Sequence, residues 1–149
     1  MKVSAKVECG IVALLDIAIN CTGGNVVKVV NIARRQGVSA KYLEQILPIL
    51  RNAALIRSVK GAKGGYTLAK EPDQITLRQV IEALDISLLT NSPSDENLDP
   101  VIAGAISDKL WNRMNENLCQ CAESVTIADL ISCYQENSQF NPEALLYYI

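Results

Sequence analysis

Histidine is absent from this chain of 149 residues. The commonest general acid or base and the commonest metal ligand are therefore missing together. No serine or cysteine stands beside a recognisable base. The glycine-rich segment at residues 60–65 lies between two predicted strands, which is not the context of a nucleotide-binding loop. These absences argue against an enzyme.

Long apolar runs and a cleavable leader are also missing. No run approaches the ~20 apolar residues that cross a bilayer, and residues 1–6 do not have the pattern of a signal peptide. We expect a cytoplasmic protein without a membrane partner. The five cysteines are an odd number without regular spacing, so they are expected to be free thiols rather than disulfides.

The net charge of −2 conceals a strong asymmetry along the chain. Residues 1–80 carry 12 Lys and Arg against 5 Asp and Glu, a balance of +7, whereas residues 81–149 carry 2 against 11, a balance of −9. A basic half suits the phosphates of nucleic acid, and an acidic half would be repelled by them. The two halves are therefore expected to do different work.

Residues 29–51 have the pattern of two short amphipathic helices joined by a tight turn. Ile32 and Ala33 close the first helix onto a core, Gly37 allows the bend, and Ser39 can cap the second helix. The apolar face of the second helix comprises Leu43, Ile46, Leu47 and Leu50. This spacing matches a DNA-binding helix-turn-helix.

Neighbouring segments complete a winged helix. Residues 3–20 predict a supporting helix capped by Ser4, residues 26–36 and 39–52 predict the next two helices, and Pro48 predicts a kink or altered hydrogen bonding near Glu44. Residues 55–59 and 66–69 alternate as paired strands, with Lys60 and Lys63 in the basic tip between them. A capping box at residues 76–79 opens a further helix that ends near residue 84.

The composition changes after residue 84. Residues 85–99 are rich in Ser, Asn, Asp and Pro and predict a linker, and residues 100–149 predict a long helix with a C-terminal arm that includes a short helix at 127–134. One side of the long helix is apolar, at Ile102, Ala105, Ile106, Leu110, Met114 and Leu118. Self-association would cover that side. The expected fold is thus mainly α with a small β-hairpin, in which a winged helix-turn-helix domain at residues 1–84 precedes a dimerisation helix.

These residues resemble the Rrf-type bacterial transcription regulators, which include an iron–sulfur cluster regulator, a nitric-oxide-sensitive repressor and a cysteine metabolism repressor. The resemblance rests on MKVSAK at the start, IARRQGVSAKYLEQIL in the centre, LRNAALIRSVKGAKGGYTLA in the wing and ITLRQVIEAL after it. It covers about the first 85 residues, and the later long helix and T-x-x-D-L segment are matched at residues 100–118 and 126–130.

The resemblance implies a homodimeric regulator, most simply a repressor, that binds a palindromic operator in double-stranded DNA. The expected recognition-helix residues are Ser39, Lys41, Tyr42, Glu44 and Gln45. The expected wing residues are Lys60, where the family usually has arginine, with Lys63, Gly64, Gly65 and Tyr66. Arg34, Arg35 and Arg51 are expected to hold phosphates. For every one of these side chains the alternative is a solvated surface residue without a DNA contact.

The chain departs from the cluster-binding members of the family. Several members hold an iron–sulfur cluster on three cysteines before the long helix, and residues 85–100 contain none, so we expect no metal and no cofactor. Cys119 and Cys121 leave two alternatives open, half of a metal site shared across a dimer or exposed thiols in a turn that respond to oxidation. Cys9 and Cys133 are expected to pack in cores.

The closest resemblance of the C-terminal segment is to the cysteine metabolism repressor, which associates with cysteine synthase. This enzyme class captures peptides that end in isoleucine, so Tyr148 and Ile149 are candidate docking residues for cysteine synthase. The alternative is that Leu145 to Ile149 pack on the dimer arm. The sequence therefore predicts a DNA-binding regulator, controlled through a protein partner or, alternatively, through redox or iron–sulfur sensing.

Overall fold

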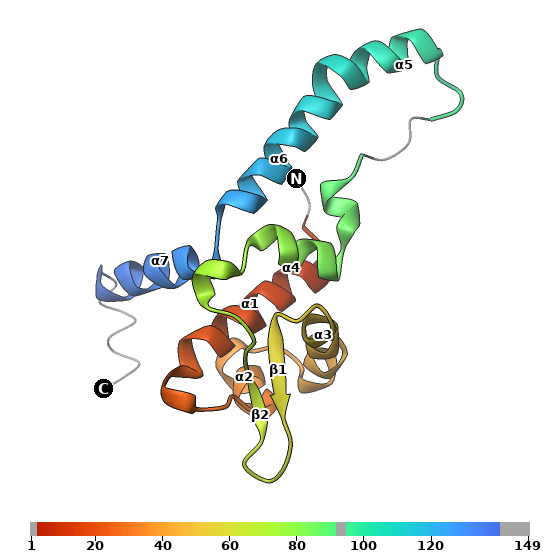
Figure 1. Ribbon diagram of the computed structural model, residues 1–149. Helices are drawn as coiled ribbons and strands as arrows, with labels where there is room; N and C mark the ends of the chain where they lie inside the picture. Colours follow the sequence, from red (N-terminus) through yellow and green to blue (C-terminus); the bar gives the residue numbers. More distant parts are fainter. Residues whose placement is uncertain (1–2, 92–94, 141–149) are drawn as a thin grey trace.

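The computed structural model describes residues 3–91 and 95–140 and shows a winged-helix body from which a long helix projects (Figure 1). Its strands, β1 (Ile56–Val59) and β2 (Gly65–Leu68), pair antiparallel. Its helices are α1 (Ala5–Asn20), α2 (Val29–Gln36), α3 (Ala40–Asn52), α4 (Leu77–Leu84), α5 (Pro100–Ile106), α6 (Asn112–Ser124) and α7 (Ile127–Phe140). Short 3₁₀ turns are η1 (Thr22–Gly24), η2 (Pro72–Gln74) and η3 (Ile86–Leu89), and a π-turn, η4 (Ser107–Trp111), joins α5 to α6.

Side-chain caps begin the helices where the sequence predicted them. The Ser4 hydroxyl accepts from the backbone N–H of Val7 at 3.3 Å, which fixes the start of α1. Thr76 and Gln79 form a reciprocal capping box at the start of α4, with distances of 3.3 and 3.2 Å. Each cap satisfies backbone donors that a helix leaves unpaired at its N-terminus.

Helix α1 lies at the centre of the body (Figure 1) and packs against α2, α3, α4, α7 and β2. Its buried face includes Val7, Leu14 and Ile17, each at most 1% exposed. Leu43, Leu47 and other apolar residues of α3 complete the same core. The predicted apolar periodicity of both helices is therefore confirmed. Because α3 continues through Pro48 to Asn52, the proline does not end this helix.

One charged side chain is buried within this apolar setting. Asp16 of α1 is 2% exposed, and among the described residues it is the only charged side chain that is buried. Its carboxylate accepts from Arg35 Nε at 2.9 Å, from Arg35 Nη2 at 2.7 Å and from Gln36 Nε2 at 2.8 Å. A buried carboxylate is stable only when such donors replace water. This group therefore ties the C-terminal turn of α2 to α1.

The first helix of the helix-turn-helix begins later than predicted. The sequence predicted a helix from residue 26, but α2 begins at Val29. Val27 instead forms a β-bridge with Tyr66, in which each backbone N–H donates to the other residue's carbonyl at 2.8 Å. This pairing attaches the wing to the segment before α2, and it involves residues too distant in sequence for periodicity to reveal.

The long helix extends further than predicted. It continues to Ser124 rather than Leu118, because Leu118, Cys119 and Ala122 pack against the body next to α4 and η3. Within the segment predicted as a linker, Leu89 of η3 is buried and belongs to the same core. The upper part of the helix extends away from the body (Figure 1).

Helix α7 returns the chain to the body. Thr126 and Asp129 cap it reciprocally at 2.9 and 3.2 Å. The helix begins at Ile127, as predicted, and continues to Phe140 rather than Tyr134. Ile127 is fully buried, and its backbone N–H donates to Ile75 O at 2.9 Å. The junction of α6 and α7 is thereby clamped to the segment that precedes α4.

We predict that Asp16→Ala lowers the free energy of unfolding by about 2 kcal/mol, because it removes the shared acceptor of two charge-assisted bonds and an amide bond. Arg34→Ala, at the neighbouring exposed arginine, should change it by less than about 0.5 kcal/mol. Urea denaturation at one fixed protein concentration measures both variants. Equal losses in the two variants, or none in Asp16→Ala, would contradict a structural role for this carboxylate.

Candidate nucleic-acid interface

Helices α2 and α3 and the hairpin lie in the part of the body away from the long helix (Figure 1). Gly37 joins the two helices in the left-handed conformation, with φ of 65°, which a residue with a side chain rarely adopts. The backbone N–H of Val38 donates to Ala33 O at 3.2 Å and closes the turn. The predicted helix-turn-helix is therefore present, and Gly37 occupies the position that requires glycine.

Helix α3 has one buried face and one polar face. Ser39 caps it, accepting from the backbone N–H of Tyr42 at 3.3 Å. Lys41, Glu44 and Gln45, spaced three and four residues apart, are exposed on the face opposite the buried leucines and isoleucine. Tyr42 is half-buried and packs against the core. Its side chain therefore helps to hold α3 on the body rather than projecting from the exposed face of the helix.

The wing is held by close backbone packing. A Cβ atom on Gly64 would lie 2.1 Å from Val59 O, and one on Gly65 would lie 2.6 Å from Val27 O. The resemblance counts both glycines among the wing residues expected at the DNA. The structure gives them an internal reason, since no other residue fits there without moving a strand.

Cationic side chains surround this end of the molecule. Of the predicted phosphate contacts, Arg34 and Arg51 are exposed, as are Lys60 and Lys63 at the wing tip. Arg35 is placed differently, because its guanidinium binds the buried Asp16. Its side chain is 35% exposed. We therefore assign Arg35 to positioning α2 rather than to direct contact.

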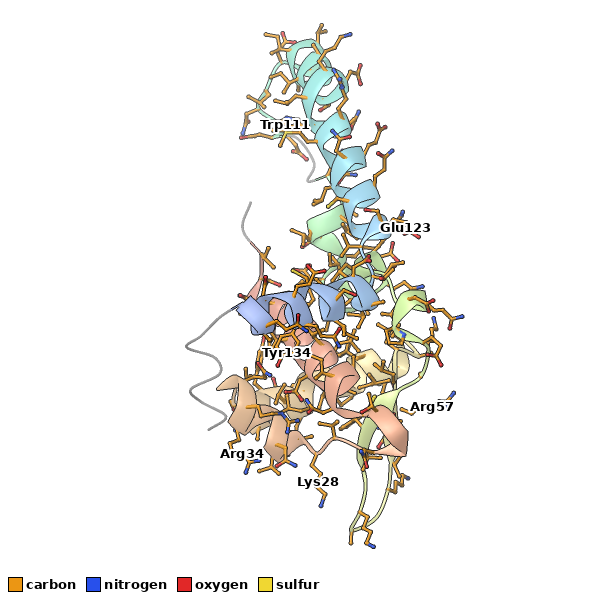
Figure 2. All side chains as sticks on the ribbon, turned by 90° about the vertical axis from the view of Figure 1, so that its left-hand side faces the viewer. Lys28, Arg34, Arg57, Trp111, Glu123 and Tyr134 are labelled. Carbon is orange, nitrogen blue, oxygen red and sulfur yellow. The ribbon has the colours of Figure 1, made fainter. Side chains whose placement is uncertain are left out.

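Lys28 and Arg57 were not singled out by the sequence. The Lys28 ammonium donates to Ala62 O in the wing tip at 3.2 Å, across 34 residues of sequence. Arg57 of β1 is exposed, and its Nη2 donates to Ala69 O at 3.4 Å. Figure 2 shows Lys28 and Arg34 extending from the same end of the body, while Trp111 lies far away on the long helix. A solitary lysine before a helix gives no sequence signal of such a contact.

The cysteines do not form a metal site within the chain. All five lie in the described part, where no group of three or more metal-ligating side chains converges. Cys119 and Cys121 lie on α6 and not in a turn as predicted, and two residues apart on a helix they point to different sides. The donor set therefore does not fit a cluster held by one chain.

The remaining thiols differ in exposure. Cys9 is buried as expected, and burial raises the pKa of its thiol, which keeps it neutral and unreactive. Cys133 is exposed, so the prediction that it packs in a core is wrong.

Among the described residues, no helix combines the length and apolar character needed to cross a membrane.

Comparison with known proteins decides the family. A model of the Rrf2 family, described as an iron-dependent transcriptional regulator, matches residues 3–133. The chain belongs to the Rrf2 family of transcriptional regulators. This Rrf2-family protein is a helix-turn-helix regulator and not an enzyme, as the absence of histidine and catalytic motifs predicted.

Individual relatives match most or all of the chain. The protein is 34% identical to the transcriptional regulator CymR of Bacillus subtilis over 151 aligned positions, which cover 100% of both chains. The solved structure of CymR, described as the global cysteine regulator of B. subtilis, has a TM-score of 0.75 at 32% identity and covers 89% of this chain and 97% of that one. The structure of IscR from T. potens has a TM-score of 0.74 at 33% identity, covering 92% and 90%. These neighbours confirm the winged helix-turn-helix fold.

We predict that Gly65→Ala destabilises the protein by about 1–3 kcal/mol, because the added Cβ must push β2 away from the Val27 carbonyl. Gly104→Ala is the matched control, since a Cβ there meets nothing within 4 Å and alanine favours the helix. Chemical denaturation compares the two variants, and hydrogen exchange at the Tyr66 amide reports the bridge directly. An unchanged exchange rate in Gly65→Ala would show that the wing does not depend on this contact.

Proposed function

We propose that the protein is a homodimeric repressor that binds a palindromic operator, with α3 in the major groove and the wing in the adjacent minor groove. The observation that carries this proposal is the placement of α3 and a basic wing at one end of the body, with an uncovered apolar helix at the other. A DNA-binding surface and a self-association surface are thereby separated along the molecule.

The exposed face of α3 has the chemistry of base recognition. Gln45 can form two hydrogen bonds with the major-groove edge of adenine, and Lys41 can donate to guanine or to a phosphate. Glu44 can accept a hydrogen bond from the amino group of cytosine, and its negative charge would repel a nearby phosphate. Arg34, Arg51 and the wing lysines supply contacts that hold the protein on the backbone without recognising sequence, with Ser39, Tyr42, Gly64, Gly65 and Tyr66 shaping the surface.

The long helix supplies the dimer. Ile102 is 61% exposed and Met114 is 56% exposed, and Ala105, Ile106 and Leu110 beside them are also exposed, whereas Leu118 packs on the body. Covering a half-exposed aliphatic side chain gains about 1 kcal/mol, so several such residues from each of two helices can stabilise a dimer. Two-fold symmetry then places two recognition helices on half-sites about 34 Å apart.

We predict that Gln45→Ala weakens binding to the preferred operator about 5- to 100-fold and relaxes its base preference at one position in each half-site. Lys60→Ala should weaken all duplexes alike and reduce the salt dependence of binding by about one counterion per wing. Fluorescence anisotropy between about 50 and 200 mM salt measures both effects, on a duplex that the wild type selects from a random library.

Lys109→Ala is the control for this pair, because Lys109 lies on the long helix at the other end of the molecule. It should leave affinity and salt dependence unchanged. If Gln45→Ala and Lys60→Ala bind like the wild type, the proposed placement of α3 and the wing on DNA is wrong.

The proposal also covers how the DNA-binding activity is controlled, namely through a protein partner. We infer that the regulator acts on sulfur or cysteine metabolism by associating with cysteine synthase, through Tyr148 and Ile149. Full-length similarity to CymR, described as a global cysteine regulator, supports this assignment. The two residues lie outside the described part of the structure. The divergent placement of Cys119 and Cys121 favours a protein partner over a metal cluster as the signal.

We predict that deleting Ile149 abolishes capture of this chain by purified cysteine synthase, because the enzyme would recognise the terminal isoleucine carboxylate. Pull-down of the two proteins, with and without Ile149, measures the difference. Leu130→Ala, on the half-buried side of α7, is a control that keeps the C-terminal residues intact. Equal capture of the full-length chain and of the chain without Ile149, or capture of neither, removes the synthase hypothesis. The DNA-binding proposal is not affected by either result.

A further inference from the structure

The long helix contains an irregular turn at its centre. Between α5 and α6, the π-turn Ser107–Trp111 has a wider hydrogen-bond pattern, in which the backbone N–H of Asn112 donates to Ser107 O, five residues earlier. An α-helix would use the residue four earlier. A π-turn therefore accommodates one residue more than a turn of α-helix, and such turns are frequent at functional positions.

The sequence contains a matching irregularity. Ile102, Ile106, Leu110 and Met114 follow one another at intervals of four residues. In a regular α-helix each interval of four rotates the side chain by about 40°, so the set would wind through about 120°. Two paired helices need alternating intervals of four and three. This stretch therefore carries one residue too many for a straight apolar line.

We propose that the π-turn absorbs the surplus residue and aligns Ile102, Ile106, Leu110 and Met114 into a single straight seam that receives the same helix of a second copy. One extra residue within a turn takes back about 100° of rotation, which cancels most of the 120° drift. This inference rests on the proposed homodimer and specifies how its interface is built.

The body itself covers a different side of the helix. Asn112 accepts from Asn91 Nδ2 at 2.8 Å, Cys119 donates to Leu89 O at 3.6 Å, and Ala122 is 6% exposed. At about 100° per residue these three positions fall together on one face of α6, about 120° from Met114. The seam therefore stays uncovered by its own chain.

Charge favours a second copy as the occupant of the seam. Between Pro100 and Leu118 the charged residues are Asp108, Lys109, Arg113 and Glu116, two acids and two bases. A neutral apolar surface does not attract DNA, which requires a surplus of cations. It does not repel an identical surface, although the rest of the C-terminal half is acidic. A second copy presents the same seam and the same balanced flanks.

Deletion and insertion at one site test this phase relation. Deletion of Asp108 removes the surplus residue, so a regular α-helix would have intervals of four, three and four, and the dimer should be kept within about threefold of the wild-type Kd. Insertion of one alanine after Asp108 adds a second surplus residue, and dimer affinity should fall at least about tenfold. Sedimentation across a protein dilution series measures both.

Matched controls distinguish a change in the rotational alignment of the seam from a change in side-chain composition or a loss of folding. Asp108→Ala keeps the length, and one alanine inserted between Pro100 and Val101 lengthens the helix ahead of the seam; both should dimerise like the wild type. Far-UV circular dichroism monitors the helix content of each variant. Retention of the dimer in the deletion variant cannot arise from misfolding.

Three results would overturn the inference. Dissociation of the deletion variant would show that the bulge itself is needed, and full dimerisation of the insertion after Asp108 would show that phase is irrelevant. Binding of the seam to another protein in place of a second copy would reject the stated occupant. A monomeric wild type would instead overturn the proposed homodimer on which the inference rests.

Discussion

Burial of α1 is the constraint on which the other elements depend, because α2, α3, α4, α7 and β2 all pack against this one helix. An almost wholly apolar helix would fix its neighbours only loosely in orientation, since hydrophobic contact has little directionality. Asp16 changes that. Its buried carboxylate is stable only where Arg35 and Gln36 can reach it, so α2 is held in one register on α1. The turn at Gly37 then passes this orientation to α3, which carries the exposed residues proposed to contact bases.

Local chemistry made much of this fold predictable, and its limits are equally physical. Ser4, Ser39 and the Thr76–Gln79 box act within four residues, so their patterns marked helix starts correctly. The bridge between Val27 and Tyr66 joins residues 39 positions apart, and no local preference marks it. The sequence likewise predicted a phosphate contact for Arg35, since local patterns do not reveal its partner. Only the fold shows that Arg35 Nη2 lies 2.7 Å from Asp16 Oδ1. Cys133 was expected in a core yet is exposed, and α7 lies at the edge of the body.

The wing illustrates how support and function share residues. Gly64 and Gly65 are required by packing against Val59 and Val27, and Lys28 holds the tip through Ala62 O. A hairpin of two strands is marginally stable alone. These attachments give it a fixed position relative to α3, which a groove-binding element needs. A glycine-rich basic loop therefore does not by itself indicate close approach to DNA, because internal packing explains the glycines fully while the lysines remain exposed at the tip.

The position of the seam on the long helix bears on the proposed spacing of the DNA-binding ends. The lower end of α6 is fixed to the body by Cys119 and Ala122, and the clamp at Ile127 holds its junction with α7. In the proposed dimer, any rotation of the seam relative to that end would therefore rotate the second copy's whole body about the helix axis. An uncorrected surplus residue amounts to about 100° of such rotation, and two recognition helices must lie about 34 Å apart on one face of the duplex. A rotation of that size would move one of them off the DNA. In the proposed dimer the π-turn would thus be coupled to DNA recognition by rigid-body geometry, although it lies far from α3.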